Sequence, residues 1–198
     1  MEFQKLVQQR FASREYEDRK IDDALIDEIL EMVRLSPSAL NMQPWKIKVV
    51  ADDDLKEQLY DKSFYQSQIT KCSHVLVFCA NRDLQGQIEK IINGMKAAGV
   101  PEEQINRYKT ATQLVLSGSE ESVLCEAQKN VYIAVTQAIY AAKSLGIDSC
   151  IVQGFEPAAY SEILELPSNL VPTLLVTLGY AADSPRPKVR FPKEDIFF

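Results

Sequence analysis

Two apolar runs constrain the fold of this chain more than any other feature: HVLVFCAN at 74–81 and VPTLLVTLGYA at 171–181. Each run has the length of a strand, and neither shows a strict alternation of apolar and polar residues. Continuous apolar runs of this kind are typical of strands buried on both faces, because a strand with one face in water alternates. We therefore expect a sheet with both faces covered by other elements.

Helical patterns alternate with the strands and can supply this cover. In IDDALIDEILEMVRLS, with Asp22 or Asp23 as the N-cap, the apolar residues fall on one helical stripe. These residues are Leu25, Ile26, Ile29, Leu30 and Val33. Further strands are expected at 46–51 and in GIDSCIVQGF. The pattern predicts an α/β or α+β protein with a sheet between helices.

A long helix is predicted from about Glu120 to Leu145, closed by Gly146. Its second half, VYIAVTQAIYAAKSLG, is apolar or small on most faces. Such a helix is buried on more than one side, either in a core or against a partner subunit.

We find no internal repeat and no linker, so we expect residues 1–198 to form a single domain. Residues 83–120 read as charged helix interrupted by GVP, and they are a possible lid. Residues 183–198 form a proline-rich tail with Arg186, Lys188 and Arg190 close together.

The formal net charge of −6 argues against nucleic acid or an anionic membrane surface as a partner. Any phosphate site must therefore be a local cluster of Arg and Lys. We see no N-terminal signal and no apolar run of roughly 18–20 residues that could span a membrane. A soluble, cytoplasmic protein is the expectation.

Several kinds of site are not predicted. The four cysteines contain no CxxC pair and are expected to be free, buried and reduced. The single histidine, His74, starts an apolar strand, where a structural role is favoured over a catalytic one. Neither a metal site nor a catalytic side chain is expected, and GxGxxG, GxxxxGK[ST], GxSxG and HExxH are absent.

Three short segments carry polar groups beyond what a connection requires: RFASR at 10–14, SPSALNMQPW at 36–45 and PKVR at 187–190. Each has an ordinary explanation. The two arginines can interact with a helix end or with solvent, the second segment can be a surface loop with Trp45 in the core, and the third can be a solvated basic tail.

Taken together and in order, these segments resemble the flavin-dependent nitroreductase family. QSQITKCSHVLVFCA, KNVYIAVTQAIYAAKSLGID, CIVQGFE and PKVRFP extend the likeness to nearly the whole chain, except about 83–120. The chain is most similar to the oxygen-insensitive NAD(P)H nitroreductases and flavin reductases, which are small dimeric FMN enzymes. The resemblance implies an α+β fold with a mostly antiparallel central sheet flanked by helices, in an intertwined homodimer.

The resemblance also implies which residues bind FMN. Arg10, Lys188 and Arg190 match the cations that meet the phosphate, and Arg14 matches the basic residue at the pyrimidine edge of the ring. The backbone of Phe11 and Ala12 would lie along the ring and phosphate path. Pro37, Ser38, Ala39 and Asn41 match positions that contact the flavin held by the other subunit. Gln68 would bind the ring, and Val152, Gln153 and Gly154 match the strand end whose backbone N–H faces the flavin N5.

The implied function is two-electron transfer from NAD(P)H to a nitroaromatic, quinone or similar flat acceptor by a ping-pong mechanism. Three alternatives remain: a flavin-binding protein without turnover, a relative with other flavin chemistry such as reductive dehalogenation or ring-forming oxidation, and an interaction domain without cofactor. Ala12, Tyr65, Asn130 and Gln153 depart from the residues frequent in the family, which leaves substrate preference open. The physiological acceptor and the choice between NADH and NADPH are not legible.

Overall fold

The computed structural model describes residues 2–198 and contains a four-stranded sheet in the order β1-β2-β4-β3. The strands are β1 (Trp45–Val50), β2 (His74–Asn81), β3 (Asp148–Val152) and β4 (Leu170–Gly179). Each neighbouring pair is antiparallel. The two apolar runs of the sequence are the two central strands, so the predicted α+β fold with an antiparallel sheet is confirmed.

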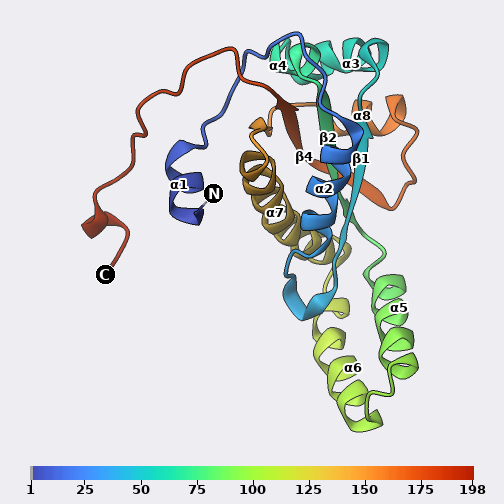
Figure 1. Ribbon diagram of the computed structural model, residues 1–198. Helices are drawn as coiled ribbons and strands as arrows, with labels where there is room; N and C mark the ends of the chain where they lie inside the picture. The colour runs from blue at the N-terminus through green and yellow to red at the C-terminus, as the bar shows by residue number, and fades with distance from the viewer. Residues whose placement is uncertain (1) are drawn as a thin grey trace.

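Helices cover both faces of this sheet (Figure 1). One face packs against α2 (Asp23–Arg34) and α7 (Glu120–Ser144). The other packs against α3 (Asp53–Tyr60), α4 (Gln68–Lys71) and α8 (Pro157–Ile163). Alternate residues of β2 supply the two cores, with Leu76, Phe78 and Ala80 on the first face and Val75, Val77 and Cys79 on the second. Burial on both faces explains why β2 lacks an apolar–polar alternation.

The ends of the two covering helices follow from local chemistry. The Asp22 carboxylate accepts a hydrogen bond of 3.0 Å from the Ala24 backbone N–H, which caps α2. Just after the C-terminal end of α7, Gly146 has a φ of +78°, a left-handed conformation that glycine adopts without a steric penalty. The predicted stripe of α2 is also confirmed, since Ile26, Ile29 and Val33 are buried.

Residues 83–120 form a pair of helices that extends away from the end of the sheet (Figure 1). These helices are α5 (Leu84–Ala97) and α6 (Glu102–Leu116), and α6 also contacts the short 3-10 helix η1 (Ala39–Asn41). The helical character predicted for this segment is confirmed. Its role as a lid stays a prediction.

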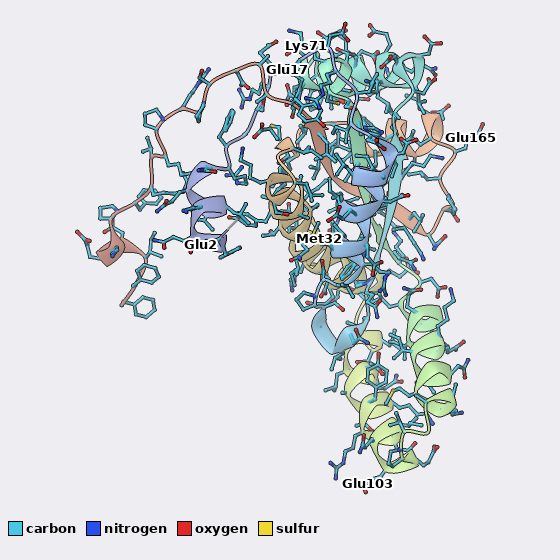
Figure 2. All side chains as sticks on the ribbon, in the orientation of Figure 1. Glu2, Glu17, Met32, Lys71, Glu103 and Glu165 are labelled. Atoms are coloured by element: carbon cyan, nitrogen blue, oxygen red, sulfur yellow. The ribbon has the colours of Figure 1, made fainter. Side chains whose placement is uncertain are left out.

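The two ends of the chain lie away from the sheet (Figure 1). Helix α1 (Phe3–Gln9) approaches α7, with the Phe3 and Tyr140 ring centroids 5.4 Å apart. The C-terminal tail passes through η3 (Lys193–Asp195), and its apolar side chains stand exposed (Figure 2). These side chains are Val189, Phe191, Ile196, Phe197 and Phe198. Helix α7 also leaves Tyr132 and Ile133 exposed on the side opposite the core.

The cysteines are free, but one of them differs from the prediction. Cys72, Cys79 and Cys150 are buried, whereas Cys125 is exposed because it lies on the outer side of α7. His74 is buried at the start of β2, where its Nδ1 lies 2.9 Å from the Ser73 hydroxyl, and burial lowers its pKa. No helix formed by residues 2–198 has the length and apolar character needed to cross a membrane.

Candidate functional site

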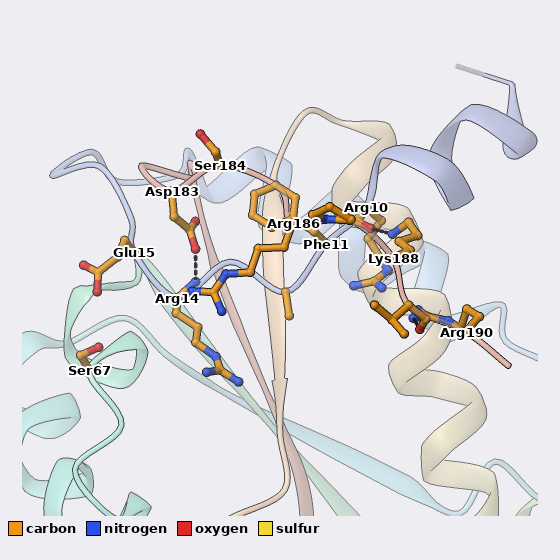
Figure 3. A pocket seen from close by; sticks show the side chains of 13 residues that line it. Arg10, Phe11, Arg14, Glu15, Ser67, Asp183, Ser184, Arg186, Lys188 and Arg190 are labelled. Carbon is orange, nitrogen blue, oxygen red and sulfur yellow. Dashed lines mark hydrogen bonds between the residues drawn. The ribbon is translucent and has the colours of Figure 1, made fainter.

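A pocket of about 500 Å³ lies between the segment that follows α1 and the C-terminal tail (Figure 3). Six of the residues predicted from the sequence line it: Arg10, Phe11, Ala12, Arg14, Lys188 and Arg190. Arg186, Ser184, Asp183, Glu15 and Ser67 also contribute to the wall. The RFASR and PKVR segments, which are remote in sequence, therefore face one space.

The N-terminal segment reaches this position by running along the free edge of the sheet. Ala12 forms a parallel bridge with Ser149 of β3, and the Ser13 backbone N–H donates to the Ser149 carbonyl at 3.2 Å. Tyr16 then forms an antiparallel bridge with Ala181, just beyond β4. These two bridges place residues 10–14 beside the start of the tail.

Asp183 joins the two walls of the pocket. Its carboxylate accepts hydrogen bonds from the Ser13 hydroxyl and from the Arg14 backbone N–H, the latter at 3.0 Å. Partial burial opposes ionisation of Asp183, but the hydrogen bonds from Ser13 and Arg14 outweigh it, and the pKa of Asp183 lies below its ordinary value. Sequence reasoning did not identify Asp183, because its partners lie about 170 residues away along the chain.

We expect Asp183→Asn to loosen the attachment of the N-terminal segment in a pH-dependent way. A carboxyl whose pKa is lowered by folding stabilises the native state above its ordinary pKa, and this contribution disappears as the pH falls through the lowered pKa. The free energies of unfolding of wild type and variant should therefore differ at neutral pH, and the difference should shrink as the pH falls below about 4. Urea titrations between pH 7 and pH 3 test this, and a constant difference would contradict it.

Within residues 2–198, the pocket cations Arg10, Arg14, Lys188 and Arg190 have no acidic partners. None of the ion pairs formed within residues 2–198 includes Arg10, Arg14, Lys188 or Arg190. The Lys188 ammonium donates to the Arg10 carbonyl, and its pKa is lowered by partial burial and by the charges of Arg10 and Arg190. Repulsion among neighbouring cations favours an anion between them.

The two carboxylates of the same pocket do not neutralise this cluster. Glu15 pairs with Lys71 at 2.5 Å, and Asp183 is held by Ser13 and Arg14 as described. The carboxylates of the pocket therefore have other hydrogen-bond partners than the side chains of Arg10, Lys188 and Arg190. Arg and Lys side chains in such a setting can hold a phosphate by charge-assisted hydrogen bonds.

Gln68 and the end of β3 form a second group of predicted residues. Gln68 is buried, and its amide Nε2 donates to Gln66 Oε1 at 3.1 Å. Gln66 Nε2 donates in turn to the Gly154 carbonyl at 2.7 Å. Val152 is buried at the end of β3, while Gln153 and Gly154 are exposed. Since Ser67 lines the pocket, this group lies beside it.

Pro37, Ser38, Ala39 and Asn41 do not line the pocket formed by their own chain. They follow α2 at the end of the molecule where η1 contacts α6. Some of their polar groups form hydrogen bonds that hold the loop in place. The Ala39 N–H donates to Asn130 Oδ1 at 2.8 Å, and the Gln43 N–H donates to Ser38 Oγ at 3.0 Å.

The loop of η1 is also conformationally unusual. Leu40, Asn41 and Gln43 have φ values of 50°, 53° and 47°, which non-glycine residues adopt only at a cost of order 1–3 kcal/mol each. Trp45, which follows, is buried as expected. Strained and exposed polar residues of this kind are typical of functional loops.

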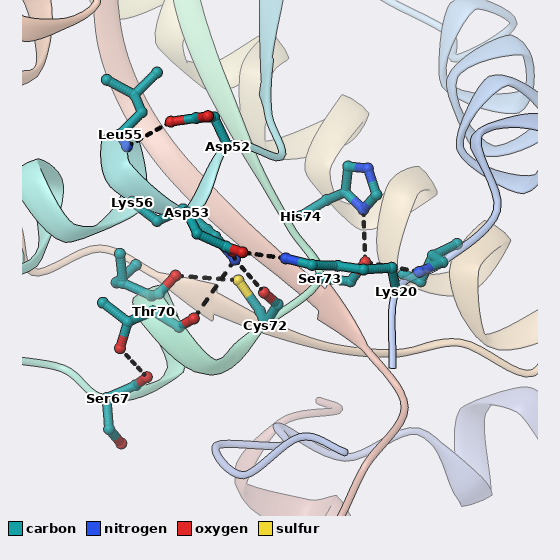
Figure 4. A network of polar contacts seen from close by, with 12 residues as sticks. Lys20, Asp52, Asp53, Leu55, Lys56, Ser67, Thr70, Cys72, Ser73 and His74 are labelled. Atoms are coloured by element: carbon teal, nitrogen blue, oxygen red, sulfur yellow. Dashed lines mark hydrogen bonds and ion pairs between the residues drawn. The ribbon is translucent and has the colours of Figure 1, made fainter. Parts of the chain in front are cut away.

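A second polar cluster, around Lys56, serves the structure (Figure 4). Lys56 is buried, and its ammonium lies 2.7 Å from Asp53 Oδ1 and 2.6 Å from the Cys72 carbonyl. Lys20 pairs with the same carboxylate at 2.6 Å, and the two lysine contacts lower the pKa of Asp53 to about 2. Within the described part of the chain, no group of three His, Cys, Asp or Glu side chains could hold a metal ion.

Comparison with known proteins adds independent information. Residues 7–180 match the family model described as "Nitroreductase family". A Staphylococcus haemolyticus protein classed with the NAD(P)H nitroreductases is 32% identical over 94% of this chain and 92% of its own. A Thermus thermophilus protein named NADH dehydrogenase is 31% identical over 94% and 90%.

Solved structures agree with these sequences. A nitroreductase family protein from Streptococcus pneumoniae has a TM-score of 0.88 at 28% identity, covering 100% of this chain and 99% of its own. An Exiguobacterium sibiricum protein described as a nitroreductase, crystallised with FMN, has a TM-score of 0.90 at 26% identity, covering 99% and 96%. From the family match, the sequence relatives and the shared fold, we conclude that this chain belongs to the nitroreductase family.

Proposed function

We propose that this chain is an FMN-dependent oxidoreductase that transfers two electrons from NADH or NADPH to nitroaromatic compounds, quinones or similar flat acceptors. The observation that carries the proposal is the cluster of Arg10, Lys188 and Arg190 in one pocket of an acidic chain, where the described residues give them no acidic partner. The FMN phosphate is a dianion near neutral pH, and it fits three cations that repel one another.

The remaining pocket residues suit the rest of the cofactor. The Arg14 guanidinium would lie at the pyrimidine edge of the ring, where a cation stabilises the charge of the reduced form. The Phe11 and Ala12 backbone would follow the path from ring to phosphate. Gln68 and the chain at 152–154 would hold the polar ring edge, with a backbone N–H directed at N5.

We assign no side chain as a general acid or base. FMN, when bound, would supply the redox chemistry, by passing two electrons from the nicotinamide to the acceptor. The protein orients the ring and leaves one face open, so that NAD(P)H and the acceptor bind in turn, which is a ping-pong scheme. In this proposal residues 1–198 act as one domain, with α5 and α6 as a lid over the acceptor.

We further propose a homodimer with each FMN at the subunit interface. Pro37, Ser38, Ala39 and Asn41 lie away from the pocket of their own chain and are free to reach that of a second copy. The exposed Tyr132 and Ile133 of α7 and the apolar tail offer surfaces for such a partner. The four free thiols suit the reducing cytoplasm, where we place the protein.

The experiment that tests the function is reconstitution followed by rapid mixing. The purified protein should bind added FMN, giving a yellow flavoprotein, and anaerobic NADH or NADPH should bleach it. A nitroaromatic or quinone should then restore the oxidised spectrum. Failure to bind FMN would refute the proposal, while binding without bleaching would indicate a flavin carrier instead.

The contribution of the second subunit can be tested with Asn41→Ala. The side chain is exposed and its known contact is with Gln43, so the fold should survive. Loss of one hydrogen bond to the flavin of the partner should weaken FMN binding about fivefold, the equivalent of about 1 kcal/mol. Fluorescence titration of FMN measures this. Unchanged affinity, or tight FMN binding by a monomer in sedimentation, would argue against an interfacial site.

A further inference from the structure

Gln66 links two parts of the candidate ring site that are separate in sequence. Its Nε2 lies 2.9 Å from the Ser63 carbonyl and 2.7 Å from the Gly154 carbonyl. Its Oε1 accepts a hydrogen bond of 3.1 Å from Gln68 Nε2. One amide thus connects the loop before α4, the buried Gln68 and the turn that follows β3.

The direction of these bonds is chemically forced. Two backbone carbonyls can only accept hydrogen bonds, so the amide nitrogen of Gln66 must face them. Its oxygen must then face Gln68, which has to present its own nitrogen. The side-chain oxygen of Gln68 is consequently the atom of this amide that is left to accept a hydrogen bond.

Gly154 has few anchors besides this hydrogen bond within the described residues. Apart from the ladder between β3 and β4, the described chain gives residues 153–155 one hydrogen bond, from Gln66 to the Gly154 carbonyl. The next anchor is the Glu156 N–H, which donates to the Lys62 carbonyl at 2.8 Å. Glycine has more backbone freedom than any other residue, so an unanchored Gly154 would sample several orientations.

The loop that carries Gln66 is itself well fixed. Phe64 and Tyr65 have left-handed φ values of 53° and 57°, and the Tyr65 N–H donates to the Tyr60 carbonyl at 3.1 Å. The Phe64 ring also lies against Gly154, since a Cβ added there would be 3.5 Å from Phe64 Cδ2. A strained loop held this firmly can set the position of a neighbouring turn.

We propose that Gln66 is a positioning residue for the redox reaction. This inference rests on the proposed function, in which FMN lies along residues 152–154. By holding the Gly154 carbonyl and the Gln68 amide at once, Gln66 sets which backbone N–H faces the flavin N5 and which amide atom faces the ring. Gln66 acts through these two groups and has no contact of its own with the reacting atoms.

The test compares holoproteins of wild type, Gln66→Met, Gln66→Glu and the control Gln58→Glu. Methionine keeps the length of the side chain but cannot donate, and glutamate places negative charge against two carbonyls. Gln58 is exposed on α3, so Gln58→Glu repeats the charge change outside this network and outside the proposed lid. Near-UV circular dichroism checks the fold of each variant. If Gln66→Glu does not fold, Gln66→Met alone provides the test.

Two readouts separate positioning from mere structural support. The first is the ¹⁵N chemical shift of N5 in bound, labelled FMN, which reports its hydrogen bond and should change in both Gln66 variants. The second readout is the rate constant for single-turnover reduction of the bound FMN at saturating nucleotide. NADH or NADPH is used, whichever reduces the wild type faster. We expect this rate constant to fall about tenfold to 100-fold, the range for a reactant misplaced by about 1 Å. FMN affinity should stay within about threefold, because the phosphate contacts are unaffected.

The outcomes distinguish the two proposals. If wild type does not bind FMN, the proposed function fails and this inference fails with it. If wild type binds FMN and the Gln66 variants keep its N5 signal and reduction rate, Gln66 is not a positioning residue, while the proposed function stands. Weaker FMN binding with an unchanged N5 signal would likewise overturn the inference, since it would indicate structural support alone.

Discussion

Removing two tail cations with Lys188→Ala and Arg190→Ala is expected to weaken FMN binding at least about 100-fold. A hydrogen bond to a charged group contributes about 1.5–3 kcal/mol, so two of them account for at least two orders of magnitude in Kd. Both side chains are exposed and make no ion pair within residues 2–198, so their loss should leave the fold intact. Fluorescence titration with FMN is the measurement.

The matched control for this pair is Lys46→Ala with Lys48→Ala. These two lysines are exposed on the edge strand β1, and their removal changes the net charge by the same amount. If the pocket binds the phosphate, the control should keep wild-type affinity, and only the wild type and control should lose affinity steeply in salt. Equal loss in both double variants would mean that net charge, and not the pocket, determines binding.

Gly179→Ala is expected to destabilise the protein by about 1–3 kcal/mol, the range for overpacking a filled core. A Cβ on Gly179 would lie 2.4 Å from Tyr16 Cδ1, which is too close for two carbon atoms that are not bonded to each other. Tyr16 cannot move easily, because it is buried and its hydroxyl lies 2.8 Å from Thr177 Oγ1. Displacing Tyr16 would also strain its bridge to Ala181, next to the pocket.

Gly94→Ala provides the opposite expectation. Gly94 lies inside α5, where an added Cβ meets nothing within 4 Å. Alanine should therefore stabilise this helix by about 0.5–1 kcal/mol. Urea unfolding of the apoproteins at one protein concentration measures both variants, since unfolding of the proposed dimer would depend on concentration. If the Gly179→Ala protein proves as stable as the Gly94→Ala protein, the prediction is wrong, because Tyr16 then moves aside without a cost in free energy.

The secondary structure was predictable because the sequence patterns that indicate helices and strands are local. The unbroken apolar character of 74–81 and 171–181 reflects burial on both faces, and the structure places these runs as the two central strands. Asp22 caps α2 and Gly146 closes α7 through interactions within one helical turn. Short segments such as α4 carried no comparable signal, because four residues are too few to show a period.

For the candidate site, the sequence indicated which residues contribute but not which of them contact one another. The cations of RFASR and PKVR were recognisable from the resemblance, and so was the QG at 153–154. Neither composition nor spacing indicated that Asp183 would join Ser13 and Arg14, or that Gln66 would reach Gly154 across 88 positions. These contacts depend on which strands are neighbours.

By itself, then, the sequence determined the covered sheet and the helices on its faces, and its resemblance to the family pointed to the cations of the proposed phosphate site. The tertiary structure decided that residues 10–14 and 183–190 share one pocket, because the N-terminal segment bridges to β3 and to Ala181 beyond β4. It also decided that Pro37–Asn41 lie away from that pocket. The physical reason is range: the apolar patterns and caps that indicate strands and helices lie within a few residues of each other, whereas a site is assembled by contacts between segments that only the folded sheet brings together.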